Sequence, residues 1–275
     1  MTIYRRFKEF FKKLINTRLW FVVAIVGTIH QTLKNFSPVL IWRDSDGDWI
    51  NKRKKLTIFS PTLNVDSYKN IQSRVEDLWL HKYDITQDNI IFDIGAGIGD
   101  DIVYLSRISS NTAKLYAIEA HPITYRCLQK TINANLLENV IPINVACCDT
   151  EKVLSISSST EEHLGNNIFQ SSNDNIDVRG MTLDSLAREH NIHNVDFIKI
   201  NIEGAEYEAL LGSNNLINSN THFVVSCHDF KYLETQEKYF KTFDKTKKLF
   251  NENNREVYSR SDDHRREVPY YLYTI

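Results

Sequence analysis

The sequence predicts an α/β fold of the Rossmann-like, doubly wound type, with a mostly parallel sheet, an antiparallel C-terminal hairpin and an N-terminal helical extension. Two observations support this prediction. From residue 89 onward, short apolar runs alternate with segments of helical periodicity, which is typical of repeated βα units. A glycine-rich turn follows the first apolar run, at the place where such folds hold a nucleotide-like ligand.

Five apolar runs are the candidate parallel strands. They span residues 90–94, 115–118, 140–145, 197–202 and 223–227. In the intervening segments apolar residues recur with a period near 3.6, so each segment is expected to form an amphipathic helix. Parallel strands joined in this way need right-handed crossovers, which place helices on both faces of the sheet.

The C-terminal part of the chain departs from this alternation. A charged helix is predicted over residues 235–251, followed by two short strands over 256–259 and 270–275. With 261–266 as a hairpin loop, these strands would form an antiparallel pair at one end of the sheet. Residues 153–157 and the Ser- and Asn-rich stretch after them predict an excursion that follows the third strand.

Residues 1–60 are assigned to the N-terminal extension and residues 61–275 to a single globular domain, because 275 residues are too few for two full-sized enzyme domains. An apolar stretch, 19–29, follows a strongly basic start. A helix that spans a bilayer needs roughly twenty residues. The shorter stretch is therefore interpreted as a hairpin-like insertion.

Two roles are open for this extension. Its basic start carries an amphipathic pattern, which suits peripheral contact with a membrane; the apolar members of that pattern are Phe7, Phe10, Phe11 and Leu14. A helical arm that packs on its own domain or on a second subunit fits equally well. No small-residue cleavage site follows, so a secretory signal is not favoured. The expected location is the cytoplasm, with membrane association and oligomeric state left open.

The composition excludes some partners. The formal net charge is -2, which gives no general electrostatic case for binding nucleic acid. The four cysteines include one adjacent pair, Cys147 and Cys148, and show no C-x-x-C spacing. Neither a zinc site nor a disulfide framework is expected, and a reducing compartment fits best.

The glycine-rich turn lies directly after the first strand, at residues 95–99. Glycines let the backbone approach a ligand closely, and the next helix offers free N–H groups. A dinucleotide site would have a further glycine where Asp100 stands, and a carboxylate there would repel a pyrophosphate. Asp93, two residues before Gly95, can engage a positively charged amino-acid group. S-adenosylmethionine carries that group and has no pyrophosphate.

Glu119 ends the second strand, about twenty residues after the glycine turn. An acidic residue at this place can accept both hydroxyls of a ribose, as nucleoside-binding sites in Rossmann-like folds require. Glu119 could instead only complement the dipole of the following helix. Together with Asp93 and the glycines, it makes S-adenosylmethionine the predicted cofactor.

Three blocks of the sequence resemble the FkbM-type methyltransferases, a branch of the class I S-adenosylmethionine-dependent enzymes. The blocks are residues 92–99, residues 116–122 with Asn133 and Asn135, and residues 182–186 leading into 195–206. The last block, Val-Asp-Phe-Ile-Lys-Ile-Asn-Ile-Glu-Gly-Ala-Glu, is the most specific. The resemblance covers roughly residues 75–230 and implies methyl transfer, usually to an oxygen of a sugar, glycan or other small-molecule acceptor.

The resemblance also implies residues that hold the cofactor. They are Asp93, Gly95, Ala96, Gly97 and Asn201 at the methionine end, Glu119 with Ala120 at the ribose, and Ala146 with Cys147 beside the adenine. Asn201 is a departure, because the family pattern more often has Asp there. An amide can hold the cofactor's amino group through its carbonyl, but it cannot act as a charged base or as a strong metal ligand.

The candidate catalytic residues follow the fourth and fifth strands, and they are His228, Glu203 and Asp229. His228 is the favoured general base, because a neutral imidazole suits proton removal near neutral pH, although it could instead only cap the strand. Glu203 and Glu206 could cap the following helix. Asn201, Glu203 and Asp229 could in principle form a metal site, but their spacing does not require one and no metal is predicted.

Two other functions remain open at this point. A NAD(P)-dependent oxidoreductase would also use a glycine-rich turn, but Asp100 and the block 197–206 argue against it. A catalytically silent binding or scaffold protein at a membrane is suggested by the basic N-terminus and by Asn201. Binding of the cofactor without transfer to any acceptor would favour that second alternative.

Overall fold

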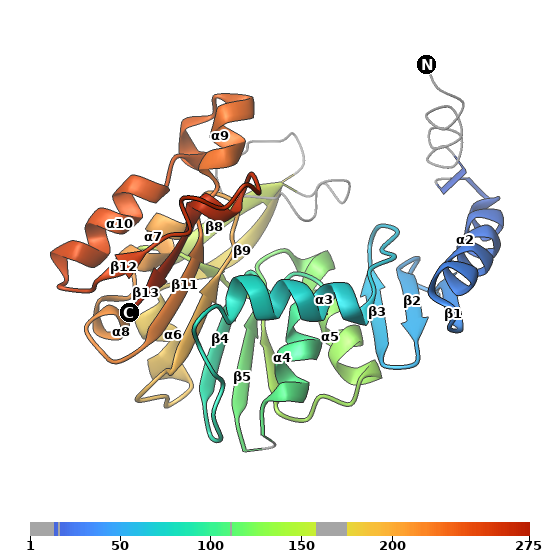
Figure 1. Ribbon diagram of the computed structural model, residues 1–275, viewed down its shortest axis with the longest axis horizontal. Coiled ribbons are helices and arrows are strands. Elements are labelled where there is room, and N and C mark those ends of the chain that lie inside the picture. The colour runs from blue at the N-terminus through green and yellow to red at the C-terminus, as the bar shows by residue number, and fades with distance from the viewer. Residues whose placement is uncertain (1–13, 16, 111, 158–174) are drawn as a thin grey trace.

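The computed structural model describes residues 14–15, 17–110, 112–157 and 175–275. Its centre is a seven-stranded sheet with the order β12-β13-β11-β10-β4-β5-β6 (Figure 1). The strands are β4 (Ile90–Ile94), β5 (Lys114–Ile118), β6 (Val140–Ile143), β10 (Phe197–Ile200), β11 (His222–Ser226), β12 (Val257–Tyr258) and β13 (Tyr271–Thr274). The first five run parallel, and β13 pairs antiparallel with both β11 and β12. The predicted fold class is confirmed.

Helices cover both faces of this sheet. One face carries α3 (Tyr68–Arg74) with the π-helical turn Val75–Trp79, α4 (Asp100–Ile108) and α5 (Pro122–Ala134). The other carries α6 (Leu183–Glu189), α7 (Glu206–Leu211), α8 (Asn214–Ile217) and α10 (Phe243–Glu252). Successive residues of a strand point to opposite faces, so Ile91 and Phe92 of β4 belong to different apolar cores.

The excursion after the third strand forms a second sheet. β6 ends at Ile143, earlier than the predicted run, and the next residues form β7 (Ala146–Cys147). β7 pairs with β9 (Asn175–Met181), which also pairs with β8 (Lys152–Ser157), so the strand order is β7-β9-β8. All four cysteines are buried and none forms a disulfide.

The predicted start of the charged helix over 235–251 is wrong. The chain forms α9 (Asp229–Thr235), a 3-10 turn (Lys238–Phe240) and only then α10. Asp229 accounts for the late start, because its Oδ2 accepts the backbone N–H groups of Thr242 (2.9 Å) and Phe243 (2.8 Å). These are the groups that a helix leaves unpaired at its N-terminus, so Asp229 fixes where α10 begins.

The apolar stretch near the N-terminus is not a hairpin-like insertion. It lies in one helix, α2 (Trp20–Asn35), followed by an antiparallel sheet of β1 (Val39–Arg43), β2 (Trp49–Arg53) and β3 (Leu56–Ser60). The sequence did not predict this sheet. Three apolar members of the predicted amphipathic pattern, Phe7, Phe10 and Phe11, lie outside the described residues. Within the described part of the chain, every helix falls short of the length and apolarity that crossing a bilayer requires.

The N-terminal sheet packs on its own domain through α5. Backbone N–H of Phe59 in β3 donates to the Thr131 hydroxyl at 3.0 Å. The turn between β1 and β2 gathers three carboxylates around the ammonium of Lys130. Its Nζ lies 2.6 Å from an oxygen of each of Asp44, Asp46 and Asp48. The Lys130 cation thus joins this acidic turn to α5.

Candidate functional site

The glycine turn brings the ends of β4 and β10 into close contact. Gly95 has a φ of +75°, and a Cβ there would lie 2.1 Å from the carbonyl oxygen of Asn201. Any larger residue would therefore force the two strand ends apart. Gly97 has a φ of +58°, but a Cβ built on it meets no atom within 4 Å. The turn is thus closed at Gly95 and open beside Gly97, where a ligand could approach the backbone.

Glu119 lies across the turn from Gly97. Its Oε2 accepts the Gly97 backbone N–H at 3.0 Å, and its Oε1 accepts that of His121 at 2.8 Å. The side chain is half-buried, and burial raises the pKa of Glu119 to about 7. Each carboxylate oxygen has a second lone pair, so Glu119 keeps acceptor capacity for two ligand hydroxyls. Asn144, which the sequence did not single out, donates to the carbonyls of Glu119 (2.8 Å) and Ala120 (2.9 Å).

Asp93 is buried beneath the turn and forms an ion pair with Lys199 of β10. The Lys199 Nζ lies 2.6 Å from the Asp93 Oδ1, and the two side chains are 2% and 0% exposed. Burial raises the pKa of Asp93, and the Lys199 ammonium opposes that shift. The Asp93 Oδ2 has no hydrogen-bond partner among the described residues. Oδ2 is thus the one oxygen of this carboxylate without such a partner, and it is buried beneath the turn.

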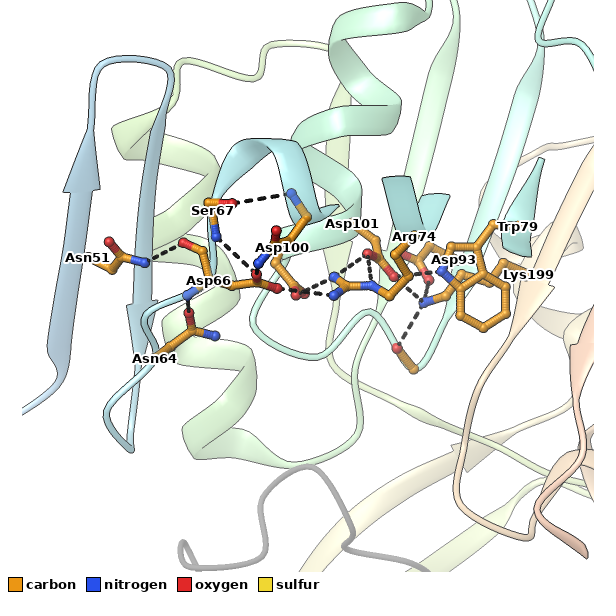
Figure 2. Close-up of polar contacts among 12 residues, drawn as sticks. Asn51, Asn64, Asp66, Ser67, Arg74, Trp79, Asp93, Asp100, Asp101 and Lys199 are labelled. Atoms are coloured by element: carbon orange, nitrogen blue, oxygen red, sulfur yellow. Dashed lines mark hydrogen bonds and ion pairs between the residues drawn. The ribbon is translucent and has the colours of Figure 1, made fainter. Parts of the chain in front are cut away.

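A chain of charges extends from this ion pair to the outer surface of α3. Figure 2 shows Arg74 between the two acidic residues that begin α4: its Nη2 lies 2.7 Å from Asp100 Oδ2 and 2.6 Å from Asp101 Oδ1. The indole of Trp79 donates to Asp101 Oδ2 at 2.8 Å, and Lys199 Nζ lies 3.8 Å from the same oxygen. The sequence argument treated the Asp100 carboxylate as a free charge, but Arg74 neutralises it.

A second group of charges surrounds His228, just after β11. The His228 Nδ1 lies 2.7 Å from Glu206 Oε1, and its Nε2 lies 3.4 Å from Glu203 Oε2. The hydroxyl of Thr242 donates to Glu206 Oε2 at 2.9 Å, and Lys231 forms an ion pair with Glu203. We call these five residues the His228 cluster.

The environment of His228 differs from the one assumed for a neutral base. Burial alone would lower the pKa of His228, but the carboxylates of Glu206 and Glu203 raise it to about 9. The imidazole is therefore protonated at neutral pH. Burial raises the pKa of Glu203, but His228 and Lys231 outweigh this and lower it, so Glu203 remains a carboxylate. Glu203 also has a φ of +55°, a backbone conformation that non-glycine residues seldom adopt.

The predicted site residues form two groups at the carboxyl edge of the sheet. The first surrounds the glycine turn and contains Asp93, Gly95, Ala96, Gly97, Glu119, Ala120 and Asn201. The second contains His228 and Glu203, with Asp229 beside them in its capping role. Ala146 and Cys147 are buried in β7 of the small sheet.

Sequence reasoning missed Lys199 and Arg74. Lys199 could have been noticed, because a lysine inside an apolar strand needs an acidic partner when it is buried. Its partner, Asp93, lies 106 residues earlier in the chain, so spacing alone did not pair them.

A family model for the methyltransferase FkbM domain matches residues 93–262. The chain belongs to this family. The match covers more than half of the chain and includes the glycine turn, Glu119 and the His228 cluster. It confirms the predicted family, the methyltransferase class and S-adenosylmethionine as the cofactor, and it disfavours the oxidoreductase alternative.

Several solved structures are similar to this one at low sequence identity. Fibrillarin from Aeropyrum pernix, crystallised with natively bound S-adenosyl-L-methionine, is 10% identical, with 87% of this chain and 100% of that chain covered and a TM-score of 0.48. Precorrin-6y C5,15-methyltransferase from Geobacter metallireducens is 11% identical, with 79% and 90% covered and a TM-score of 0.42. A search of curated protein sequences found no significant match. The fold assignment comes from the strand order described above.

Proposed function

We propose that this protein transfers the methyl group of S-adenosylmethionine to a hydroxyl oxygen of a sugar, glycan or related small-molecule acceptor. The observation that best supports the cofactor part of this proposal is the pairing of Glu119 with the open side of Gly97, because it combines a ribose acceptor with a turn that a ligand can approach. The His228 cluster lies at the same edge of the sheet, after the ends of β10 and β11. An acceptor hydroxyl there would meet ionisable groups.

The residues of the turn fit this cofactor. The half-buried Glu119 carboxylate can accept the two ribose hydroxyls, and the Asp93 Oδ2 is a buried acceptor without a partner among the described residues. When bound, the cofactor supplies a methyl group on a positively charged sulfur that leaves as a neutral thioether. The Asp93 and Lys199 ion pair fixes the end of β4, so the turn is held in position before the ligand arrives.

We propose that His228 accepts the acceptor's proton at Nε2, the ring nitrogen with the longer carboxylate contact, when its imidazole is neutral. With a pKa of about 9, roughly one molecule in a hundred has a neutral His228 at pH 7. The methyl-transfer rate should therefore rise with pH and level off near pH 9. If His228 only positions its neighbours, the rate is flat through this range and His228→Ala retains turnover.

The first experiment is calorimetric titration with S-adenosylmethionine, its demethylated product and NAD. The wild-type protein should bind the first two and not NAD. Glu119→Gln should weaken the binding of S-adenosylmethionine and of its demethylated product by about ten-fold or more, because it removes a charged acceptor for hydroxyl groups. Glu138→Gln makes the same chemical change at an exposed residue outside the site and serves as the control. Binding of NAD alone, or of nothing, would contradict the proposal.

The second experiment follows transfer of an isotope-labelled methyl group to a panel of sugars, oligosaccharides and small alcohols. Label in an ether-linked methyl group is the expected result for at least one acceptor. A protein that binds the cofactor and labels none of them would favour the catalytically silent alternative, which the Asn201 departure suggests. Asn201→Asp is the informative variant there, since it restores the carboxylate that the family pattern more often has at this position.

A further inference from the structure

Helix α2 is apolar on two opposite faces. Residues of an α-helix advance by about 100° each, so Val23 and Ala24 lie on one side, where they are buried against the N-terminal sheet. On the opposite side lie Ile25, Val26, Ile29 and Leu33, all exposed; Phe21, also exposed, lies toward the margin of this side, and Phe36 follows at the helix end. We call these six residues the apolar stripe. A surface helix normally buries its apolar face, so a second apolar side that is exposed is unusual.

The position of α2 leaves this stripe open. In Figure 1, α2 lies at the outer edge of the molecule, with β1, β2 and β3 between it and the seven-stranded sheet. Leu33 is 69% exposed and Phe36 is 98% exposed. Scattered exposed apolar residues are ordinary, but six of them gathered on the outer side of one helix and at its end mark a surface that contacts something.

The charged residues of α2 and of the sequence that precedes it are mostly basic. α2 contains Lys34 and no acidic residue. The eighteen residues at the N-terminus include one acidic residue, Glu9, and six basic ones, which are Arg5, Arg6, Lys8, Lys12, Lys13 and Arg18. Repulsion between identical basic segments disfavours self-association of this surface, whereas an anionic lipid headgroup attracts it.

The exposed aromatic residues near the two ends of α2 include Trp42 of β1 and Phe36, whereas Trp20 itself packs on the buried side with Val23 and Ala24. Trp20 begins α2 and packs edge-on against Trp42, which is exposed, with 5.1 Å between ring centroids. Phe36 lies at the other end. Tryptophan is enriched where protein meets the headgroup region of a bilayer, because its ring is apolar and its N–H is polar.

We propose that the apolar stripe of α2 docks on an anionic lipid surface, with the helix lying in the plane of the membrane. At sixteen residues α2 is about 24 Å long, shorter than the ~30 Å bilayer core, so it would rest on the surface and not cross it. Apolar side chains would enter the headgroup boundary, and the exposed Arg18, just before the helix, and Lys34, near its end, would pair with lipid phosphates and carboxylates. This surface is separate from the methyl-transfer site and does not depend on the proposed acceptor.

The test is co-sedimentation of the full-length protein with vesicles of phosphatidylserine and phosphatidylcholine, compared with vesicles of phosphatidylcholine alone. The wild-type protein should sediment with the anionic vesicles, and less so as salt is raised. Ile29→Glu and Leu33→Glu should each reduce partitioning by about ten-fold or more, because each removes one large apolar side chain and adds a repelling charge. Circular dichroism checks that both variants are folded.

Two controls separate this proposal from its rivals. Val153→Glu places the same charge on another exposed apolar residue, in β8 of the small sheet, and should leave vesicle binding unchanged. Sedimentation velocity without lipid measures the oligomeric state. Absence of wild-type binding to anionic vesicles, or equal loss in the Val153→Glu control, would overturn the proposal. A wild-type dimer that Ile29→Glu converts to a monomer would also overturn it, in favour of a second copy as occupant.

Discussion

Two groups of buried charged residues are linked to β10. One contains Lys199 within the strand, the other contains Glu203 and Glu206 just after it, and the two groups differ in the cation that faces the carboxylates. In the first, Lys199 and Arg74 face the carboxylates of Asp93, Asp100 and Asp101. Both cations keep their protons, since nearby carboxylates raise the pKa of each against the effect of burial. This group is a fixed scaffold beneath the glycine turn, and its two cations stay charged near neutral pH.

In the His228 cluster the central cation is an imidazole between Glu206 and Glu203. Its pKa of about 9 lies within the range of ordinary pH titrations, so the loss of this proton can be followed directly. The comparison teaches that proximity to the same strand does not give charged residues the same role. A cation that keeps its proton near neutral pH, such as Lys199 or Arg74, makes a structural pair. A cation that can lose its proton at accessible pH, such as His228, makes a group suited to proton transfer.

The largest effect should come from breaking the fixed scaffold. Lys199→Met leaves the Asp93 carboxylate buried without its cation, which should lower the free energy of unfolding by about 3–5 kcal/mol. Urea denaturation measures this change. The double variant Asp93→Asn with Lys199→Met removes both charges and should recover most of the loss. A single variant within about 1 kcal/mol of wild type would show that the pair is not a scaffold.

The His228 cluster should make stability depend on pH. The folded-state pKa of His228 is raised from 6.5 to about 9, so its stabilising contribution is fully present below pH 6.5 and is lost as pH rises through 9. The contribution is about 3 kcal/mol. Glu206→Gln removes the larger of the two carboxylate effects and should flatten this part of the profile. NMR titration of the imidazole supplies the direct check, and a wild-type midpoint near the ordinary 6.5 would refute the assignment.

A smaller effect sharpens the contrast between the scaffold and the protein surface. Arg74→Gln removes the cation shared by Asp100 and Asp101 and should cost about 1–3 kcal/mol. Arg179→Gln breaks an ion pair with Glu189 in which both side chains are about half exposed, and it should cost under about 1 kcal/mol. Thermal or urea denaturation of the two variants compares them directly. Equal losses would mean that burial of the Arg74 network adds nothing.

The sequence predicted the parts of the fold that depend on local pattern. The five parallel strands, the C-terminal antiparallel pair and the glycine turn all follow from apolar runs and from glycine spacing. The N-terminal sheet was missed because β2 and β3 meet at a basic turn, Lys54 and Lys55, which disguised their alternation. The start of α10 was misplaced because it depends on Asp229, which caps it from outside the helix.

In the candidate site, too, local sequence pattern predicted some features, and others depend on residues that are distant in the sequence. Residue types and order located Asp93, Glu119 and His228, since those positions follow strands whose ends meet at one edge of the sheet. Their protonation states could not be predicted, because each depends on a partner that folding brings near: Lys199 for Asp93, and Glu206 for His228. Sequence spacing places a charge, and only packing sets its pKa.

The central claim, that Glu119 holds the ribose of the cofactor, is tested most directly by the pH dependence of S-adenosylmethionine affinity. Calorimetry on wild type and Glu119→Gln would cover one pH unit on either side of the Glu119 pKa of about 7. Because the ligand titrates identically in both experiments, the difference between them belongs to Glu119. Protonation removes the carboxylate acceptor, so wild-type affinity should fall up to about ten-fold for each unit below pH 7. The variant should bind more weakly, and its affinity should not show this fall with pH. Equal affinities for both proteins across the range would contradict the claim.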